Sequence, residues 1–309
     1  MSEIARPLRA RNRIRKSAGE LVFDSVNALF MLFVCFIMLF PFWYCLVYSL
    51  NETHNAAMGG LWIWPRQFTL SNYKYVLLNP VIGRAYLVTI ARTVVGSLIH
   101  LVVTGFAAYT LSKRALPGRK FLTYYFVIPM FIGGTIVSMY VLMAKMRLLN
   151  TFLIYVIPGA FSFFNMAIMR AFIEELPSSL EESARIDGAS YFRSFFQIII
   201  PLCMPIIATI LIFTGVGHWL DFYTNLLYVS KPGLYTLQYL LYQIVRWGSA
   251  ADMSAGVSQM MAKAFAKEKI TNETLKMTTL VFITVPVLAI YPFFQKYIIK
   301  GVLIGSIKG

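Results

Sequence analysis

The sequence predicts an all-α integral membrane protein, and its composition gives three reasons. Hydrophobic residues make up 58% of the 309 residues, charged residues only 13%, and the mean hydropathy is +0.67. Soluble domains contain about half apolar and about a quarter charged residues. A soluble fold of this size would lack the polar side chains to cover its surface. We therefore expect one membrane-embedded domain and no large soluble domain.

Six apolar stretches are candidates for membrane spans, because a transmembrane helix needs about 20 mostly apolar residues. They cover residues 21–50, 85–111, 121–144, 152–169, 198–220 and 277–294. Proline removes a helical hydrogen bond, so Pro201 and Pro205 predict a kink in the fifth stretch, and Pro286 and Pro292 one in the sixth. The prediction is a bundle of six transmembrane helices.

The basic residues predict the orientation of this bundle, because cytoplasmic segments of membrane proteins are enriched in Lys and Arg. They concentrate in the N-terminal segment 1–20 and in the loop 112–120, at Arg6, Arg9, Arg11, Arg13, Arg15, Lys16, Lys113, Arg114, Arg119 and Lys120. An even number of helices puts these regions and both termini on one side, the predicted cytoplasm. The connection 51–84 and the segment 221–276 then lie outside, and residues 253–269 are expected to form a helix near the surface.

The sequence does not support several other classes of function. The net charge of +15 could indicate nucleic-acid binding, but many basic residues flank apolar segments, as in membrane proteins. Cys35, Cys45 and Cys203 lie in or beside apolar stretches without metal-ligand spacing, which predicts buried small hydrophobic residues and no metal site. The sequence contains no GxxxxGK[ST] phosphate loop and no HExxH motif, so we expect no catalytic residue and no ATP hydrolysis by this chain alone.

Arg92 and His100 lie inside the second apolar stretch, where ionisable groups are costly and often functional. We expect Arg92 to lie near the outer interface and to extend its charge toward water. We expect His100 to be a packed, hydrogen-bonded core residue. Neither Arg92 nor His100 has an acidic partner within the six stretches. The one acidic residue there is Asp24, at the start of the first stretch.

The loop 174–197 predicts two short helices folded at a glycine. Ser178 and Glu181 match an S-x-x-E capping box, which predicts a helix over residues 179–187. Gly188 is placed to end that helix, because glycine adopts the left-handed conformation at little cost.

Ser190 can cap the second helix, and Phe192, Phe195 and Phe196 give it an apolar face. Two interpretations remain open from these residues. A helix–elbow–helix joined to membrane spans could dock in a soluble partner and act as a lever. It could also be an amphipathic segment that only lies on the bilayer.

This stretch resembles the EAA loop of permease subunits of ABC importers, whose pattern is E-A-A, three residues, Gly, nine residues and I-x-L-P. The matching positions here are Glu182, Ser183, Ala184, Gly188, Ile198 and Pro201, with Ser183 in place of the first alanine and Ile200 in place of the leucine. The triplet Asp187-Gly188-Ala189 is similar to the carbohydrate, maltose-transporter-type branch. Residues 86–92, 107–112 and 301–309 extend the likeness over about residues 20–309.

The resemblance implies a type I ABC importer permease fold, with a first helix 21–50 and a core domain 85–295 that carries the coupling loop. It implies half of a translocation pore in a bacterial cell membrane, completed by a second, homologous permease subunit, identical or not. It also implies two ATPase subunits that bind ATP and Mg²⁺, an extracytoplasmic sugar-binding protein, and no cofactor on this chain. Residues expected to couple to the ATPases are Glu182, Ser183, Ala184, Asp187, Gly188, Ala189 and Pro201, with Lys308 and Gly309 of the tail 296–309.

The substrate path is expected to use polar residues in or near the spans, namely Tyr140, Asn165, His218, Trp219 and Asp221. An oligosaccharide is the expected cargo. The alternatives are an ABC importer permease for a non-sugar solute, a secondary, ion-coupled transporter, and a membrane-bound enzyme. A secondary transporter would need intramembrane carboxylates or broken-helix repeats, and the six stretches contain Asp24 alone.

Overall fold

A computed structural model describes residues 17–247 and 270–306. Within these ranges the chain forms helices joined by loops, and its one strand-like contact is an isolated bridge between Asn51 and Phe68. The longer helices are α1 (Ala18–Ser49), α3 (Ser71–Leu78), α4 (Pro80–Ser112), α5 (Arg119–Phe131), α6 (Ile136–Lys145), α7 (Phe163–Glu174), α8 (Ser178–Ile186), α11 (Met204–Leu220), α13 (Leu237–Trp247) and α15 (Asn272–Ser306). The short ones are α2 (Thr53–Ala57), η1 (Phe152–Tyr155), α9 (Tyr191–Ser194), η2 (Phe195–Ile199), α10 (Ile200–Leu202), α12 (Tyr223–Tyr228) and η3 (Pro232–Leu234). The predicted all-α class is confirmed.

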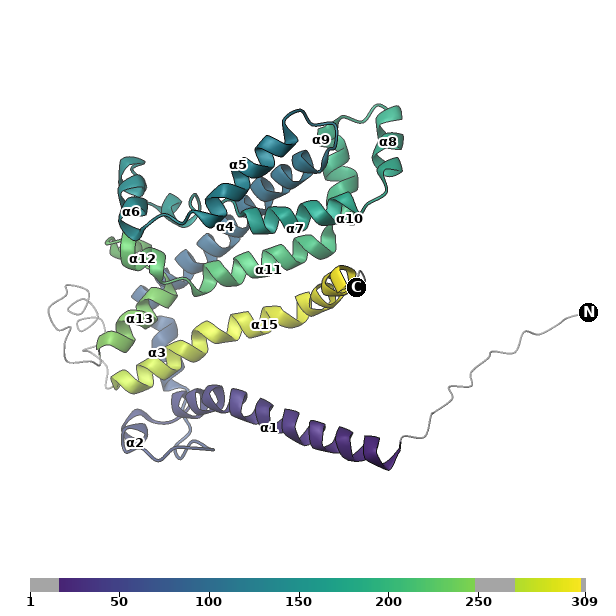
Figure 1. The fold of residues 1–309 in the computed structure, drawn as a ribbon. Helices are drawn as coiled ribbons and strands as arrows, with labels where there is room; N and C mark the ends of the chain where they lie inside the picture. Colours follow the sequence, from purple (N-terminus) through teal and green to yellow (C-terminus); the bar gives the residue numbers. More distant parts are fainter. Residues whose placement is uncertain (1–16, 248–269, 307–309) are drawn as a thin grey trace, which may run out of the picture.

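Helix α4 is the centre of the arrangement, because it packs against α11, α7 and α13, and α11 packs in turn against α15. The start of α1, the pair α8–α9 and the end of α15 lie toward one end of the molecule (Figure 1). Helices α2, α12 and α13 lie toward the opposite end. The long helices therefore run between two ends that carry different short elements.

Two hydrophobic clusters pack at the two ends of α4. Near its start the cluster joins α4 to η1, α13 and α15, and includes Ile82, Ala85, Tyr155, Leu240 and Leu275. Near its end the second cluster joins α4 to α7, η2 and α11, and includes Ala108, Tyr109, Met166, Phe195 and Ile207. Since apolar burial is the main stabilising term of a fold, α4 is held by independent packing at each end.

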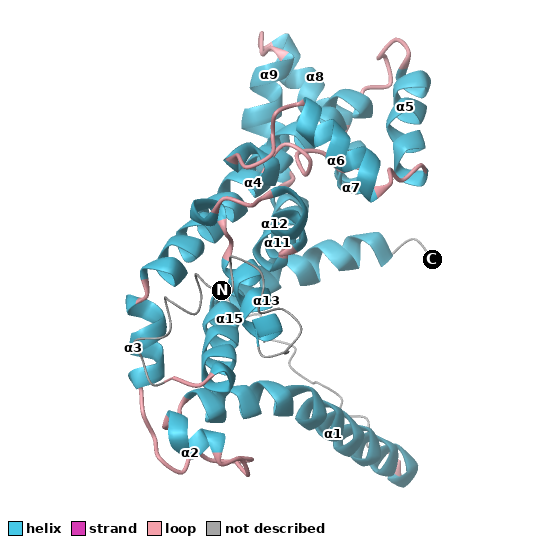
Figure 2. Ribbon diagram, turned by 90° about the vertical axis from the view of Figure 1, so that its left-hand side faces the viewer, coloured by secondary structure: helices cyan, strands magenta, loops and turns pink. Residues whose placement is uncertain are grey.

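Three helices are long and apolar enough to cross a membrane, namely α1, α4 and the first 19 residues of α15. Helix α1 has 32 residues, which is about 48 Å of helix. Most of its large apolar side chains face outward, as Phe23 and Leu29 do with 70% and 73% exposure, and its buried residues are confined to Val47–Ser49. It diverges from the other helices over most of its length (Figure 2). Such an apolar, uncovered helix is suited to lipid or to another membrane subunit.

The third predicted span, residues 121–144, is broken into α5 and α6, which are bent by 119° relative to each other. Gly133 and Gly134 lie in the break, and the Thr135 hydroxyl accepts a hydrogen bond from the Ser138 backbone N–H at 3.2 Å. A flexible glycine pair followed by a new N-cap ends one helix and begins another.

Residues 152–169 do not form one continuous helix, so the prediction of a fourth span was wrong in this respect. The chain forms η1, passes Pro158 and Gly159, and starts α7 only after the N-cap Ser162. Helix α7 has 12 residues, about 18 Å, whereas a bilayer core is about 30 Å thick. Pro158 cannot continue a helix, which explains the interruption.

The fifth stretch is kinked, as its prolines predicted. The segment Tyr191–Leu202 and helix α11 are bent by 82° relative to each other, with Cys203 between them and Pro205 at the start of α11. The described residues thus contain three long helices and two bent pairs, so the predicted number of six spans is not confirmed.

The remaining boundaries differ modestly from the predictions. Helix α4 starts at Pro80, five residues before the predicted span, because the Asn79 side chain accepts a hydrogen bond from the Val81 N–H at 3.0 Å. Helix α15 extends beyond residues 277–294 at both ends. The basic residues of segment 1–16, the helix expected over residues 253–269, and Lys308 and Gly309 lie outside the described residues.

The three cysteines are free but differ in burial. Cys203 is fully buried, as predicted. Cys35 is exposed on the uncovered surface of α1, so the prediction of burial was wrong for it. The reason is that, among the residues that the structure describes, α1 diverges from the other helices over most of its length (Figure 2).

Candidate functional site

The predicted helix–elbow–helix is present as α8, Gly188 and α9. Gly188 has a φ of +82°, the left-handed conformation expected of it. The Ser190 hydroxyl accepts a hydrogen bond from the Arg193 N–H at 3.3 Å and so caps α9, as predicted. Residues 178–194, from the start of α8 to the end of α9, are called the elbow below.

The predicted capping box was wrong. Ser178 is the first residue of α8, the N-cap is Pro177, and no side chain caps the helix. The Glu181 carboxylate instead accepts a hydrogen bond from the Tyr109 hydroxyl at 2.6 Å and forms an ion pair with Lys113. A charged partner attracts a carboxylate more strongly than a backbone N–H does, so Glu181 connects α8 to the end of α4.

Lys113, Tyr109 and Glu181 form a compact unit that we name the clamp. Besides its ion pair, the Lys113 ammonium lies 4.1 Å from the centre of the Tyr109 ring, within the range of cation–π attraction. The side chains of Lys113 and Glu181 are 25% and 16% exposed. Nearby, Arg119 and Arg170 both pair with Glu174. Basic residues of the loop 112–120 therefore bind acidic residues at the start of the coupling loop.

A second contact joins the elbow to α4 through aromatic rings. The ring centres of Phe106 and Phe195 are 4.7 Å apart, and Tyr109 lies 5.1 Å from Phe195. Phe195 is 2% exposed, whereas Phe192 and Phe196 are 64% and 44% exposed. The predicted apolar face is therefore only partly covered by α4. The elbow is attached to α4 at both of its arms, by the clamp on α8 and by Phe195 just after α9.

The outward surface of the elbow is uncovered. Helix α8 contains no buried residue, and Ile186 is 87% exposed. Of the predicted coupling residues, Ala184 and Ala189 are half-buried, and the exposed ones are Glu182, Ser183, Asp187, Gly188 and Pro201. A cavity of about 550 Å³ lies between α8 and the end of α4, lined among others by Lys113, Glu182 and Arg185. The adjacent glutamates 181 and 182 thus differ, since Glu181 is bound to α4 and Glu182 is exposed at the mouth of this cavity.

At the opposite end of α4, Arg92 forms a buried ion pair with Asp221. Arg92 is 2% exposed, its guanidinium contacts the Asp221 carboxylate at 2.6 Å and the Asp221 backbone carbonyl at 3.0 Å, and it lies 4.5 Å from the centre of the Tyr155 ring. The expectation that Arg92 extends toward water was wrong. The partner was missed because Asp221 lies one residue beyond the predicted fifth span, where sequence alone does not place it beside α4.

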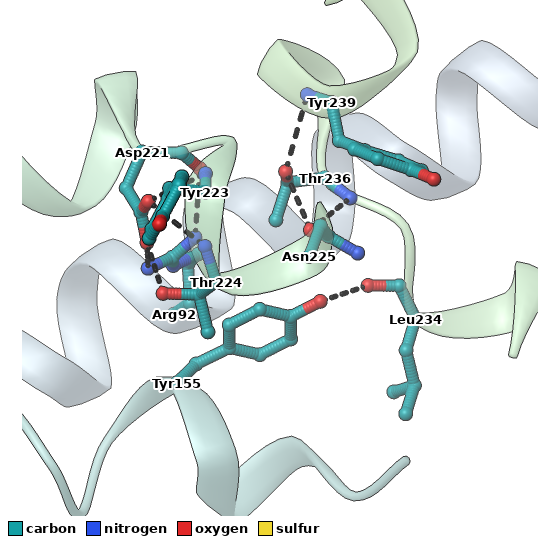
Figure 3. Close-up of polar contacts among 9 residues, drawn as sticks. All are labelled: Arg92, Tyr155, Asp221, Tyr223, Thr224, Asn225, Leu234, Thr236 and Tyr239. Atoms are coloured by element: carbon teal, nitrogen blue, oxygen red, sulfur yellow. Dashed lines mark hydrogen bonds and ion pairs between the residues drawn. The ribbon is translucent and has the colours of Figure 1, made fainter. Parts of the chain in front are cut away.

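The Asp221 carboxylate also caps α12. It accepts hydrogen bonds from the backbone N–H groups of Tyr223 at 2.8 Å and Thr224 at 3.1 Å, and from the Thr224 hydroxyl (Figure 3). Burial raises the pKa of this carboxyl, but the Arg92 charge and the hydrogen bonds from Thr224 and Arg92 outweigh it and hold the pKa below its ordinary value. Asp221 is therefore a charged, fully bonded structural residue.

Further hydrogen bonds connect the outer helices to this ion pair. The Tyr155 hydroxyl donates to the Leu234 carbonyl at 2.6 Å, and Asn225 accepts from the Thr236 hydroxyl at 2.8 Å (Figure 3). The Leu237 N–H donates to the Thr89 hydroxyl of α4 at 2.9 Å. Helices α12 and α13 are thereby fixed to the first half of α4.

His100 is a packed, hydrogen-bonded core residue, as predicted. It is 3% exposed, its Nδ1 lies 2.7 Å from the Gly159 carbonyl oxygen, and its Nε2 lies 2.9 Å from the Asn165 amide nitrogen. Nδ1 therefore donates to the carbonyl and Nε2 accepts from the amide, which is the pattern of a neutral imidazole. Asn165 is engaged in holding His100.

The predicted substrate-path residues do not form one site. His218 and Asp221 line a cavity of about 300 Å³ together with Arg92 and His100. Trp219 is 7% exposed and donates to the Ile283 carbonyl at 3.1 Å, so it joins α11 to α15. Tyr140 is 44% exposed on α6 and stacks on Tyr228. Arg92 and Tyr155 are among the cavity residues that the sequence did not assign to this path, although the charge of Arg92 within an apolar stretch was a signal.

Comparison with known proteins identifies a family and several relatives. The family model described as binding-protein-dependent transport system inner membrane component matches residues 4–304. The protein LplC of Bacillus subtilis is 38% identical over 288 residues, covering 93% of this chain and 95% of LplC. The polygalacturonan/rhamnogalacturonan transport system permease protein YtcP of Bacillus subtilis is 33% identical, covering 93% and 99%.

A solved structure shares the fold. A chain from the crystal structure of a bacterial ABC transporter involved in the import of the acidic polysaccharide alginate superimposes with a TM-score of 0.82 at 25% identity, covering 92% of this chain and 99% of that one. The resemblance to ABC importer permeases noted from the EAA-like loop is confirmed. This chain belongs to the family of binding-protein-dependent transport system inner membrane components, and it is a permease subunit of an importer.

Proposed function

We propose that this chain forms half of the membrane pore of an ATP-driven importer for oligosaccharides, and that the elbow couples the pore to a separate ATPase. ATP and Mg²⁺ bind to two ATPase subunits, a second homologous permease completes the pore, and an extracytoplasmic binding protein delivers the cargo. Family membership supports the subunit role, and the names of the relatives support a glycan cargo. The chain carries no phosphate loop of its own.

The observation that carries the coupling role is the contrast between the two faces of the elbow. Its inner face is attached to α4 by the clamp and by Phe195, and its outer face, with Glu182 and Gly188, is uncovered. A partner that pushes on the outer face therefore moves α4, and through α4 the helices packed on it. An amphipathic segment lying on the bilayer would instead need a continuous apolar face, and α8 offers Leu180 and Ile186 among charged neighbours.

The proposed topology places the elbow and both termini in the cytoplasm. The arrangement supports this, because the start of α1, the elbow and the end of α15 lie toward one end of the molecule (Figure 1). The tail with Lys308 and Gly309 is proposed to reach the ATPases from the same side. Labelling of a single cysteine introduced at Ser183 checks the topology, and reaction with an impermeant reagent from outside the cell would contradict it.

The Arg92–Asp221 pair does not support the alternative of a secondary, ion-coupled transporter. A proton relay needs a carboxylate that gains and loses a proton. Asp221 is occupied by Arg92, Thr224 and two backbone N–H groups, which hold it ionised. Uptake that survives ATP depletion but stops with an ionophore would favour this alternative.

The substitution Glu182→Lys tests the coupling role. Because Glu182 is exposed and has no structural partner in α4, the variant should insert and assemble normally. Its ATP hydrolysis in a reconstituted complex should lose the stimulation by sugar-loaded binding protein. Glu182→Gln, which removes the charge without reversing it, is the matched comparison. Normal stimulation of the Glu182→Lys complex would refute the proposal.

A further inference from the structure

The connection between α2 and α3 carries a run of large apolar side chains that are mostly uncovered. Trp62, Ile63 and Trp64 follow one another in sequence and are 63%, 73% and 72% exposed. We name residues 59–66, which contain this run, the aromatic loop. A contiguous exposed apolar surface of this kind marks a place where a protein meets another protein or a membrane.

The aromatic loop is held in a defined shape. Gly59 and Gly60 have φ values of +72° and +68°, so the chain reverses its direction there in a conformation that suits glycine. The Arg66 guanidinium donates a hydrogen bond to the Gly59 carbonyl at 2.6 Å and closes the loop. Leu61 is 2% exposed and packs in a small cluster with residues of α1 and α2. Residues 62–64 therefore have a fixed position relative to α1.

That position is level with Trp43 of α1. The Trp43 indole N–H donates a hydrogen bond to the Ile63 carbonyl at 2.9 Å, and the ring centres of Tyr44 and Trp62 are 6.4 Å apart. Trp43 lies six positions before Ser49, the last residue of α1, which is about 9 Å along the helix. The aromatic loop therefore folds back along α1 instead of extending away from its end.

The level of Trp43 coincides with the expected edge of the bilayer. No charged residue lies between Asp24 and Trp43, which are 19 positions apart, or about 28 Å of helix. The hydrocarbon core of a bilayer is about 30 Å thick. Side chains along this part of α1 face outward, as Phe33 does in its middle. A membrane span that begins near Asp24 therefore ends near Trp43.

The chemistry of the aromatic loop fits the boundary between lipid and water. Tryptophan is enriched there because its ring is apolar and its N–H is polar. The exposed Arg66 comes two positions after Trp64, and a guanidinium can bind the phosphate oxygens of lipid headgroups. A soluble partner would approach from the aqueous side, whereas the loop is turned toward the part of α1 that spans the membrane.

We infer that the aromatic loop inserts Trp62, Ile63 and Trp64 into the lipid interface beside the outer end of α1 and anchors this helix at a fixed depth. Among the described helices, α1 diverges from the others over most of its length (Figure 2), so lipid contacts at its end would fix its position. The assignment to the outer leaflet rests on the topology of the proposed function, and the insertion itself does not.

The test uses the complete importer in vesicles of phosphatidylethanolamine and phosphatidylglycerol. Cys35→Ser and Cys45→Ser remove two thiols of this chain, and the buried Cys203 is kept. Ile63→Cys then carries a nitrobenzoxadiazole fluorophore, and the signal of the complex without this added cysteine is subtracted. The vesicles contain lipids with a nitroxide quencher either near the headgroup or near the end of the acyl chain.

We expect the headgroup nitroxide to quench the label at residue 63 more strongly than the chain-end nitroxide does. Two positions serve as references. Phe33→Cys, in the middle of α1, should show the opposite order. Ser230→Cys, exposed beside Lys231 after α12, should be quenched by soluble iodide and by neither nitroxide lipid.

Variants of Trp64 give the second readout. Trp64→Asp would place a charge in the lipid interface, so the label at residue 63 should lose its quenching by the headgroup nitroxide. Trp64→Phe keeps an apolar ring and should retain the quenching. Because Trp64 is largely exposed, both variants should keep the wild-type melting temperature and basal ATP hydrolysis.

The outcomes separate the anchor from the importer role. If neither nitroxide quenches the label at residue 63, insertion is overturned and the importer role is unaffected. Quenching by iodide that stops when the binding protein is added would make that protein the occupant, and shielding from both nitroxides and iodide would indicate a neighbouring subunit. Lipid quenching together with labelling of Ser183→Cys from outside the cell would keep the insertion, move it to the inner leaflet and refute the proposed topology.

Discussion

The two ends of α4 are built differently. At one end, Lys113 and Glu181 pair near the surface with side chains 25% and 16% exposed, next to an elbow whose outer face is uncovered. At the other end, Arg92 is 2% exposed and pairs with Asp221 in a network that caps α12. Partly exposed ion pairs contribute little to stability, whereas a buried charge that loses its partner is costly. We infer that the elbow end can be moved at little cost, whereas the Arg92 end stays fixed.

The largest expected effect is on stability at the fixed end. Arg92→Met leaves the Asp221 carboxylate partly buried without its charge partner, and should lower the free energy of unfolding by on the order of 3 kcal/mol. Thermal unfolding of the protein in detergent measures this. Because the pKa of Asp221 is lowered, the contribution of the pair is present at neutral pH and is lost only as the pH falls through that lowered pKa, below 3.8.

A double variant sharpens this prediction. Arg92→Met with Asp221→Asn removes both charges, while asparagine can still cap α12. It should recover part of the lost stability. If the single and double variants unfold at the wild-type temperature, the Arg92 end is not fixed by this pair, and the contrast between the two ends of α4 fails.

The second effect concerns the conformation of the elbow. Gly188→Val forces a β-branched residue into a φ of +82°, which costs about 1–3 kcal/mol locally. Because the elbow lies outside both hydrophobic clusters, the protein should still assemble, but ATP hydrolysis should no longer respond to sugar-loaded binding protein. Gly188→Asn is the control, since asparagine tolerates this conformation better. Full stimulation of the valine variant would show that the bend is not needed for coupling.

The smallest effect on stability is expected at the clamp, about 0.5–1 kcal/mol for a partly exposed pair. Its effect on coupling should be larger, because Glu181→Lys detaches α8 from α4 by placing a like charge beside Lys113. Adding Lys113→Glu restores opposite charges and should restore sugar-stimulated ATP hydrolysis. The same Lys113→Glu change should not rescue Glu182→Lys. Rescue of both variants, or of neither, would contradict the different roles given to these neighbouring glutamates.

Local structure was predictable from the sequence where it depends on residues that are close together along the chain. The left-handed Gly188, the Ser190 cap and the bend at Pro201 and Pro205 followed from the residues themselves. The capping box failed because Glu181 found a stronger partner, Lys113, which is 68 positions away along the chain. The continuous fourth span failed because Pro158 and Gly159 interrupt the helix within a stretch that is apolar throughout.

By itself, the sequence determined that this chain belongs in a membrane, is helical, and carries a glycine-hinged loop of the importer type. These properties depend on composition, on hydrophobic length and on short motifs, which are local along the chain. Only the tertiary structure decided that Arg92 pairs with Asp221, that Glu181 rather than Glu182 binds α4, and that Gly96 and Gly159 pack against His218 at a cavity. The physical reason is that these contacts join residues far apart in sequence, and helix packing alone brings them within hydrogen-bonding distance.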